Sequence, residues 1–270
     1  MQLKEIEKLA ASVMEKAVDA KEVAGVNLLV LKDKAPVLSL QAGYADLENK
    51  VLMADDTIMR LYSMSKPITA ACMMILMQRG LVDLNDPVSK FIPAFANQTY
   101  VNGNALSLVQ RPMTVHDLLF MTSGLSYGSD SAAGKATSDL FAEMDARLST
   151  KDAMTTREFA DRVGKNPLEF QPSSNFMYGV ALIEVISGMS FSEFLKKEIT
   201  DPLEMPDTGF FVPAQKQSRL SKVYARTENE LTLYTGNHLA IKNKMDTLPA
   251  FQSGGAGLVS TLKDYANFGT

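Results

Sequence analysis

The N-terminal part of the chain shows two hydrophobic periods in succession. Over residues 3–20 the apolar side chains recur every three or four positions, which is typical of an amphipathic helix. Two runs rich in valine and leucine follow, at residues 25–31 and 37–44, separated by a charged turn that ends in Pro36. This pattern predicts an N-terminal helix followed by a β-hairpin.

A long apolar segment lies between Pro67 and Gly80. Apolar residues occupy nearly every face, which is typical of a fully buried helix. Pro67 belongs in the first turn because it lacks the N–H that an interior position needs, and Gly80 is a natural C-terminal stop. The segment therefore predicts a buried helix over residues 66–79 whose first turn begins near Ser63.

The rest of the chain is predominantly helical in pattern. Helices are predicted to start at Thr114, with a capping box, and at Thr155, and a long helix is predicted over residues 178–200. Residues 128–153 are polar and small, which indicates a surface excursion or a lid. No later segment is a convincing partner for the hairpin, although a two-stranded hairpin alone is only marginally stable.

Ser63 and Lys66 are the first candidates for chemistry. Residues three apart lie on the same face of a helical turn, close to free backbone N–H groups and the positive dipole end. A hydroxyl beside an amine whose pKa burial could lower is a candidate nucleophile. The same spacing recurs at Ser260 and Lys263, where we expect Ser260 to be an ordinary N-cap. Spacing alone therefore leaves catalysis and capping both open for Ser63.

A competing nucleophile motif, G-x-S-x-G, lies at Gly124–Gly128 with Ser126 at its centre. That motif requires a strand before it and a helix after it, whereas a helical pattern precedes it here and a polar loop follows. We therefore expect a glycine turn that ends a helix. A group that passes a proton to the leaving group is also needed, and Tyr178 is a candidate. The alternative for Tyr178 is a half-buried side chain that anchors a loop.

Composition limits the classes of function. The formal net charge is −4 and no basic cluster is evident, which argues against nucleic acid as a partner. The single cysteine, Cys72, excludes an intramolecular disulfide and is expected to be a core thiol. Two distant histidines and one buried cysteine offer no metal cluster, and no G-x-x-x-x-G-K-[ST] or G-x-G-x-x-G motif follows a strand, so neither a metal nor another cofactor is expected. No membrane span or signal peptide is evident, and the expected location is cytoplasmic.

Together these segments resemble a known family. The resemblance spans roughly residues 20 to 270 in the right order, and it is carried by Ser63-Met64-Ser65-Lys66-Pro67 and by residues 80–88, 113–125, 170–178 and 253–261. The chain is similar to the serine β-lactamase and penicillin-binding-protein superfamily. It looks most like the class C β-lactamase branch, with its family VIII esterases and D-Ala-D-Ala peptidases.

The resemblance implies an α/β (α+β) fold, with an antiparallel sheet flanked by helices and a mostly helical subdomain. Residues 1–62 would supply the N-terminal helix and hairpin, and residues 63–270 the helical region with the catalytic helix. It also implies that Ser63 is acylated by a small ester, amide or β-lactam, that Lys66 takes its proton, and that Tyr178 acts as base and then acid. The Ser63 N–H would form part of an oxyanion hole.

Two departures from the family pattern matter. The tyrosine motif commonly continues to an asparagine, whereas Val180 stands there and cannot donate an amide hydrogen bond. This favours an esterase-like hydrolase, with a D-stereospecific peptidase, a weak β-lactamase or a non-catalytic sensor as alternatives. The family's third motif, on a C-terminal strand, has no counterpart. We therefore expect a split, clipped or truncated protein, with a companion fragment that packs on the hairpin at residues 26–44.

Overall fold

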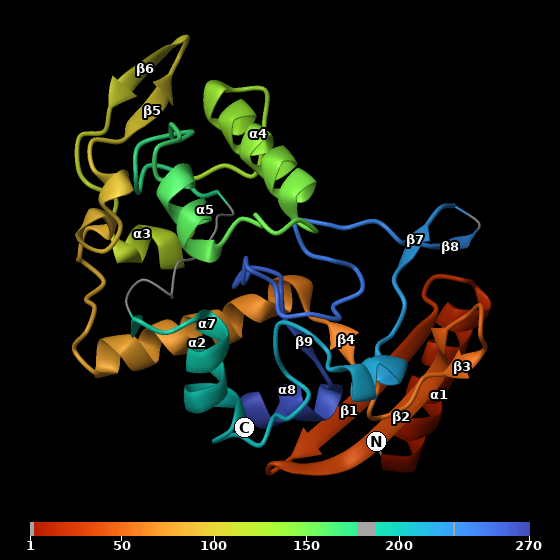
Figure 1. The fold of residues 1–270 in the computed structure, drawn as a ribbon. Helices are drawn as coiled ribbons and strands as arrows, with labels where there is room; N and C mark the ends of the chain where they lie inside the picture. The colour runs from red at the N-terminus through yellow and green to blue at the C-terminus, as the bar shows by residue number, and fades with distance from the viewer. Residues whose placement is uncertain (1–2, 178–186, 229) are drawn as a thin grey trace.

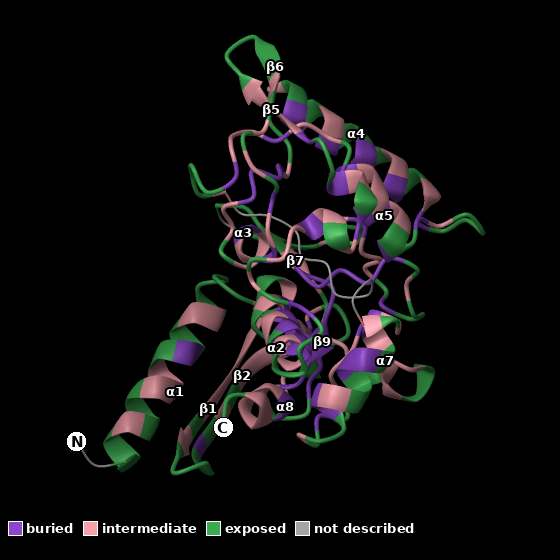
Figure 2. Cartoon of the chain, turned by 90° about the vertical axis from the view of Figure 1, so that its left-hand side faces the viewer, coloured by how far each residue is buried: buried purple, intermediate pink, exposed green. Residues whose placement is uncertain are grey.

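The computed structural model describes residues 3–177, 187–228 and 230–270 (Figure 1). An antiparallel sheet in the order β1-β2-β3 combines β1 (Gly25–Lys32), β2 (Ala35–Asp46) and β3 (Val51–Leu52). The helices α1 (Leu3–Asp19) and α8 (Leu262–Phe268) lie on opposite sides of this sheet (Figure 2). The predicted helix and hairpin are confirmed, and the α/β (α+β) fold class with them.

The other described elements are short, apart from two helices. The helices are α2 (Ser65–Gln78), α3 (Val115–Leu119), α4 (Ala132–Arg147), α5 (Thr156–Val163) and α7 (Phe191–Leu195). The strands pair as β4 (Met59–Arg60) with β9 (Val259–Ser260), β5 (Thr99–Asn102) with β6 (Ala105–Leu108), and β7 (Tyr224–Arg226) with β8 (Leu231–Leu233). In Figure 1, α3, α4, α5 and the β5–β6 hairpin gather at one end, and α2 runs between them and the sheet end.

Helix α2 organises one of the hydrophobic cores. Ile68, Cys72 and Leu76 are fully buried and follow one another at four-residue spacing, so they share one face of the helix. The opposite face is not covered, because Met74 is 47% exposed. The prediction of a fully buried helix is therefore wrong for this face. Apolar composition alone could not reveal it, since methionine is tolerated at half-exposed positions.

A second core lies between α4 and α5, where the sequence predicted a surface excursion. Residues 128–153 mostly form α4, whose buried side chains include Thr137, Leu140 and Met144 at helical spacing. The helix begins against its own preceding loop, since a Cβ atom on Gly134 would lie 2.1 Å from the Ser129 backbone nitrogen. Small residues are typical of loops in a sequence pattern, but in α4 they allow the helix to pack closely against its preceding loop.

The C-terminal expectations need two corrections. The N-cap of α8 is Thr261, whose hydroxyl accepts the Asp264 N–H, while Ser260 is buried in β9. The pairing of β9 with β4 also supplies a late strand that the sequence did not reveal.

The predicted helix over 178–200 lies partly outside the described residues. In its described part it is broken at Gly188, which has φ of +68°, and α7 starts afresh after Ser190.

Within the described ranges, no helix is both long and apolar enough to cross a lipid bilayer.

The predicted capping box at Thr114 is confirmed, and its acidic residue, Asp117, is fully buried. Both Asp117 oxygens accept hydrogen bonds from Arg111 at 2.7 Å, and the Ser173 hydroxyl donates to Oδ1 at 2.7 Å. Burial alone would raise the pKa of this carboxyl, but the hydrogen bonds from Arg111, Ser173 and Thr114 outweigh burial and hold the pKa well below its usual range. The network joins α3 to the loop that precedes residue 178.

We expect Asp117→Ala to lower the free energy of unfolding by roughly 3 kcal/mol at pH 7, because it breaks a buried charge network. A carboxylate whose pKa is depressed by folding stabilises above its unfolded pKa of about 4, and this contribution disappears as the pH falls through the folded pKa. The cost of the substitution should therefore shrink below about pH 4. Urea unfolding of the wild type and Asp117→Ala at pH 7 and pH 3 measures this loss of unfolding free energy.

The matched control is Asp161→Ala, which removes a half-exposed ion pair with Arg157 on α5. This pair should contribute less than about 1 kcal/mol at either pH. Equal costs for the two substitutions at pH 7 would contradict the assigned role of Asp117.

Candidate functional site

Ser63 lies in a tight turn between β4 and α2. The turn, Tyr62–Met64, is a 3-10 helix, and Ser63 is exposed at its centre. It is held from both sides, because the Leu61 N–H donates to the Leu258 carbonyl at 2.8 Å and the Met64 N–H donates to the Leu61 carbonyl at 3.0 Å. Tyr62 takes a φ of +46°, a left-handed conformation that side chains other than glycine rarely adopt. The backbone before the candidate nucleophile is therefore strained.

Lys66 lies on the first turn of α2, on the same side as Ser63. Its Nζ atom donates to Ser63 Oγ at 3.3 Å and to the Gly255 carbonyl oxygen at 2.7 Å. The second bond comes from a residue 189 positions later in the chain. The structure therefore brings Ser63 and Lys66 within hydrogen-bond distance, as the spacing predicted, and adds an anchor for the amine. Tyr178, the third predicted residue, lies outside the described residues.

A tyrosine that the sequence interpretation did not assign lies at the same place. A Cβ atom on Gly255 would lie 3.6 Å from Lys66 Nζ and 3.6 Å from Tyr127 Oη, so both polar groups flank this glycine. The Tyr127 ring stacks on Phe141 of α4, with ring centroids 6.4 Å apart and an interplanar angle of 7°. In the sequence, Tyr127 is marked only by its place within the G-x-S-x-G motif, directly after Ser126.

The serine of that motif has a structural role. Ser126 is 3% exposed, and its Oγ atom accepts the Gly128 N–H at 3.1 Å. Among the described residues the motif follows the short helix α3 rather than a strand. Helix α3 already ends at Leu119, and Met121 takes the left-handed position after it with φ of +58°, so the prediction that Gly124 ends the helix is wrong. Gly124 has φ of +81° in a turn beyond the helix. Of the two histidines, His116 stacks on Phe120, and His238 meets the Tyr62 ring edge-on.

The segment from Ser253 to Gly257 forms a tight turn against α2, as predicted. The Thr69 hydroxyl donates to the Gly254 carbonyl at 2.7 Å, in a buried position. A Cβ atom on Gly254 would lie 2.8 Å from the Phe191 ring and 3.0 Å from Thr69, so no side chain fits there. Glycine at 254 therefore lets this segment approach α2, which in turn places the Gly255 carbonyl within reach of Lys66.

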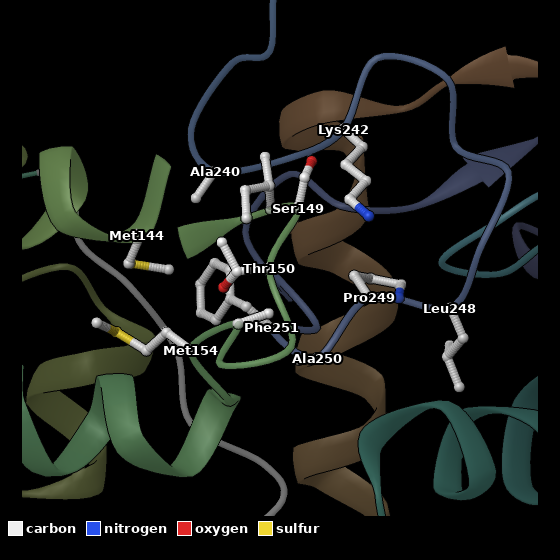
Figure 3. Close-up of a pocket in the computed structure, with 12 residues that line it drawn as sticks. Met144, Ser149, Thr150, Met154, Ala240, Lys242, Leu248, Pro249, Ala250 and Phe251 are labelled. Carbon is white, nitrogen blue, oxygen red and sulfur yellow. The ribbon is translucent and has the colours of Figure 1, made fainter. Parts of the chain in front are cut away.

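An apolar pocket of about 230 Å³ lies close to this turn. Figure 3 shows Met144 and Met154 on one side, the Phe251 ring in the middle and Lys242 at the rim. Phe251 is four residues before Gly255, so the pocket and the Lys66 anchor belong to one continuous segment. A cavity of 150 Å³ lined by such side chains can hold benzene, so this pocket has room for an apolar ring or chain.

Other chemistry finds little support among the described residues. In this part of the chain no group of three or more histidine, cysteine or acidic side chains could hold a metal ion. Cys72 is buried in α2, and burial raises the pKa of its thiol to about 12, so it is an unreactive core residue.

Comparisons with known proteins identify the family of this chain. A family model described as Beta-lactamase matches residues 10–270. The chain belongs to the Beta-lactamase family. The predicted resemblance to the serine β-lactamase and penicillin-binding-protein superfamily is thereby confirmed. Membership gives the fold, without naming a substrate.

Individual relatives are distant. Protein Rv1367c of Mycobacterium tuberculosis is 28% identical over 261 residues, which cover 93% of this chain and 62% of that protein. Esterase EstB of Burkholderia gladioli is 27% identical over 274 residues, which cover 94% of this chain and 66% of that protein. The structure of EstCE1, described as a hydrolase with promiscuous acyltransferase activity, has the same fold, with a TM-score of 0.80 and 24% identity. The match covers 98% of this chain and 71% of the EstCE1 chain. The chain thus spans slightly under two thirds of the curated relatives named here.

Two adjacent glycines should respond differently to the same change. We expect Gly254→Ala to lower the free energy of unfolding by about 1–3 kcal/mol, because its methyl group would overlap Phe191 and Thr69. Gly255→Ala should change it by less than about 1 kcal/mol, since its methyl group meets only ordinary contacts at 3.6 Å. Urea unfolding of both variants provides the comparison, and equal destabilisation would contradict the packing described for this turn.

Proposed function

We propose that this chain is a serine hydrolase, or the core of one, that forms an acyl-enzyme at Ser63 with small esters or amides. The observation that carries the proposal is the 3.3 Å contact between Ser63 Oγ and Lys66 Nζ at the start of α2, within a chain of the Beta-lactamase family. A nucleophile and its base within hydrogen-bond reach, with the base held by a third group, is the expected arrangement for covalent catalysis.

In the proposed reaction, Ser63 Oγ attacks the substrate carbonyl carbon while its proton passes to the Lys66 amine. The bond to the leaving alcohol or amine then breaks, and the leaving group takes a proton through Lys66 and a tyrosine hydroxyl. Tyr178 remains the proposed tyrosine, and Tyr127 is a second phenol close enough to Gly255 to share this role. Water then attacks the acyl-enzyme and releases the acid. The Ser63 N–H is proposed to stabilise the oxyanion.

Two features favour esters over β-lactams. Val180 supplies no amide where the family commonly has asparagine, and the pocket around Phe251 is apolar. The name of EstB is consistent with an esterase in this family. The alternatives are a D-stereospecific peptidase or weak β-lactamase, and a non-catalytic sensor that acylates once. Turnover of a short acyl ester with little turnover of a cephalosporin supports the esterase, whereas a burst without turnover supports the sensor.

We also propose that a companion polypeptide completes the sheet. In the described part of the structure β1 forms one edge of the sheet, and its backbone groups on that side can pair with another strand. A groove of about 700 Å³ adjoins this strand between the sheet and α8, lined by Asn27, Leu29 and Leu31. Both features suit an added strand beside β1.

Labelling with a fluorophosphonate, followed by intact-mass spectrometry and peptide mapping, tests the nucleophile. We expect one adduct, at Ser63, lost in Ser63→Ala and slowed at least about a hundredfold in Lys66→Met, because the serine loses its base. The matched control is Ser126→Ala, which removes the competing motif serine and should label normally. An adduct at Ser126, or unchanged labelling of Ser63→Ala, would overturn the assignment.

Native mass spectrometry tests the companion polypeptide. A second polypeptide in the native spectrum would support the companion strand, and a fully active single chain would refute the companion strand.

The apolar pocket predicts a preference for ester chain length. We expect Ala153→Phe, which fills the pocket, to reduce kcat/KM for 4-nitrophenyl hexanoate about tenfold while sparing 4-nitrophenyl acetate, because burying each methylene contributes about 0.8 kcal/mol. Ala146→Phe on the exposed side of α4 is the matched control and should leave both rates unchanged. A parallel loss for both esters in Ala153→Phe would argue against the pocket as a substrate site.

A further inference from the structure

Arg60 lies on β4, three residues before Ser63, and its positive charge has no carboxylate partner within ion-pair distance in the described ranges. Its Nη1 donates to the Ser221 carbonyl at 2.7 Å and its Nη2 donates to the Asn243 carbonyl. Its Nε is buried and has no hydrogen-bond partner there. Through these two hydrogen bonds Arg60 links the segments at Ser221 and Asn243 to β4. They leave the buried Nε donor without a partner and the charge of this half-buried side chain without a carboxylate.

A small cavity adjoins this guanidinium, and its lining contains no acidic residue. Arg60, Tyr62, His238 and Lys242 contribute to the lining. Lys242 also has no ion-pair partner within reach among the residues described. The cavity volume is about 20 Å³, roughly room for one water molecule, so only the head of a small anionic group fits. Cationic and neutral donors around such a space favour an anion.

The position of the cavity links it to the candidate nucleophile. Tyr62 precedes Ser63 directly, and another lining residue, Ala256, follows the Gly255 that binds Lys66. Lys242 lines both this cavity and the apolar pocket around Phe251. An apolar chain in the one pocket could therefore place a terminal charge toward Lys242 and Arg60.

We propose that the cavity lined by Arg60 and Lys242 is a carboxylate subsite, and that the hydrolase acts on esters that carry a carboxylate at the end of an apolar chain. The proposal rests on the proposed function for its catalytic consequence. Its binding consequence is independent, since the charge, the unpartnered donor and the cavity do not depend on Ser63. A charge-assisted hydrogen bond to the ligand carboxylate would supply the discrimination between charged and neutral chains.

Two esters of equal length measure the catalytic consequence: the 4-nitrophenyl monoester of adipic acid and 4-nitrophenyl hexanoate. We expect the ratio of their kcat/KM values to fall about tenfold in Lys242→Gln, the size expected for losing one charge-assisted hydrogen bond. Lys244→Gln, which removes the same charge from an exposed position of the same loop outside the cavity, should leave the ratio unchanged.

A third substrate distinguishes the two sides of the ester. The hexanoate ester of 5-hydroxy-2-nitrobenzoic acid carries its carboxylate on the leaving group. If the subsite accepts the acyl side, Lys242→Gln should leave the rate with this ester unchanged, whereas a tenfold loss would move the subsite to the leaving-group side. An identical ratio in the wild type and both variants, with both charged esters, would overturn the proposal.

Binding to an inactive variant separates this proposal from the proposed function. We expect adipate to raise the Tm of Ser63→Ala, and to lose this effect when Lys242→Gln is added but not when Lys244→Gln is added. No shift with adipate would overturn the subsite even if esters are hydrolysed. A shift that depends on Lys242 in a protein whose Ser63 is never acylated would support the subsite and refute the hydrolase.

Discussion

The candidate site depends on one contact, in which the segment from Ser253 to Ser260 is fastened to the N-terminal turns of α2. The Thr69 hydroxyl binds the Gly254 carbonyl at 2.7 Å, and the Leu258 N–H binds Ser65 Oγ at 3.1 Å. Lys66 completes the set through the Gly255 carbonyl. These hydrogen bonds join parts of the chain more than 180 residues apart, so the site exists only once the two cores are assembled. Burial strengthens such bonds and makes their loss costly.

The same contact explains why the backbone before Ser63 can remain in an unfavourable conformation. A side chain with φ near +46° costs on the order of 1–3 kcal/mol, and Tyr62 keeps it because both neighbours are fixed. Leu61 is bound to Leu258, and the following turn closes from Met64 back to Leu61. The result is an exposed serine in the turn before α2, next to the amine of Lys66.

Two different pockets are lined by residues that lie close to Ser63 or Gly255 in the chain. The pocket around Phe251 is mostly apolar and is built by α4, the loop between α4 and α5, and the 240–251 loop. The small cavity at Arg60 is cationic and shares only Lys242 with it. A low-dielectric surrounding strengthens the attraction of a cation for an anionic group. A ligand with an apolar body and an anionic end would fill both spaces, whereas each space alone suits only one part of such a ligand.

The sequence by itself determined the N-terminal helix, the hairpin, the start of α2 and the pairing of Ser63 with Lys66, because these follow from local periodicity and from spacing within one turn. It also determined the family. Only the tertiary structure decided that Tyr127 and Lys66 both lie beside Gly255, that Met74 is exposed and that β9 pairs with β4. These features depend on contacts between distant segments, and a single sequence carries no record of which segments meet. Tyr178, whose role the family resemblance supplied, stays a prediction.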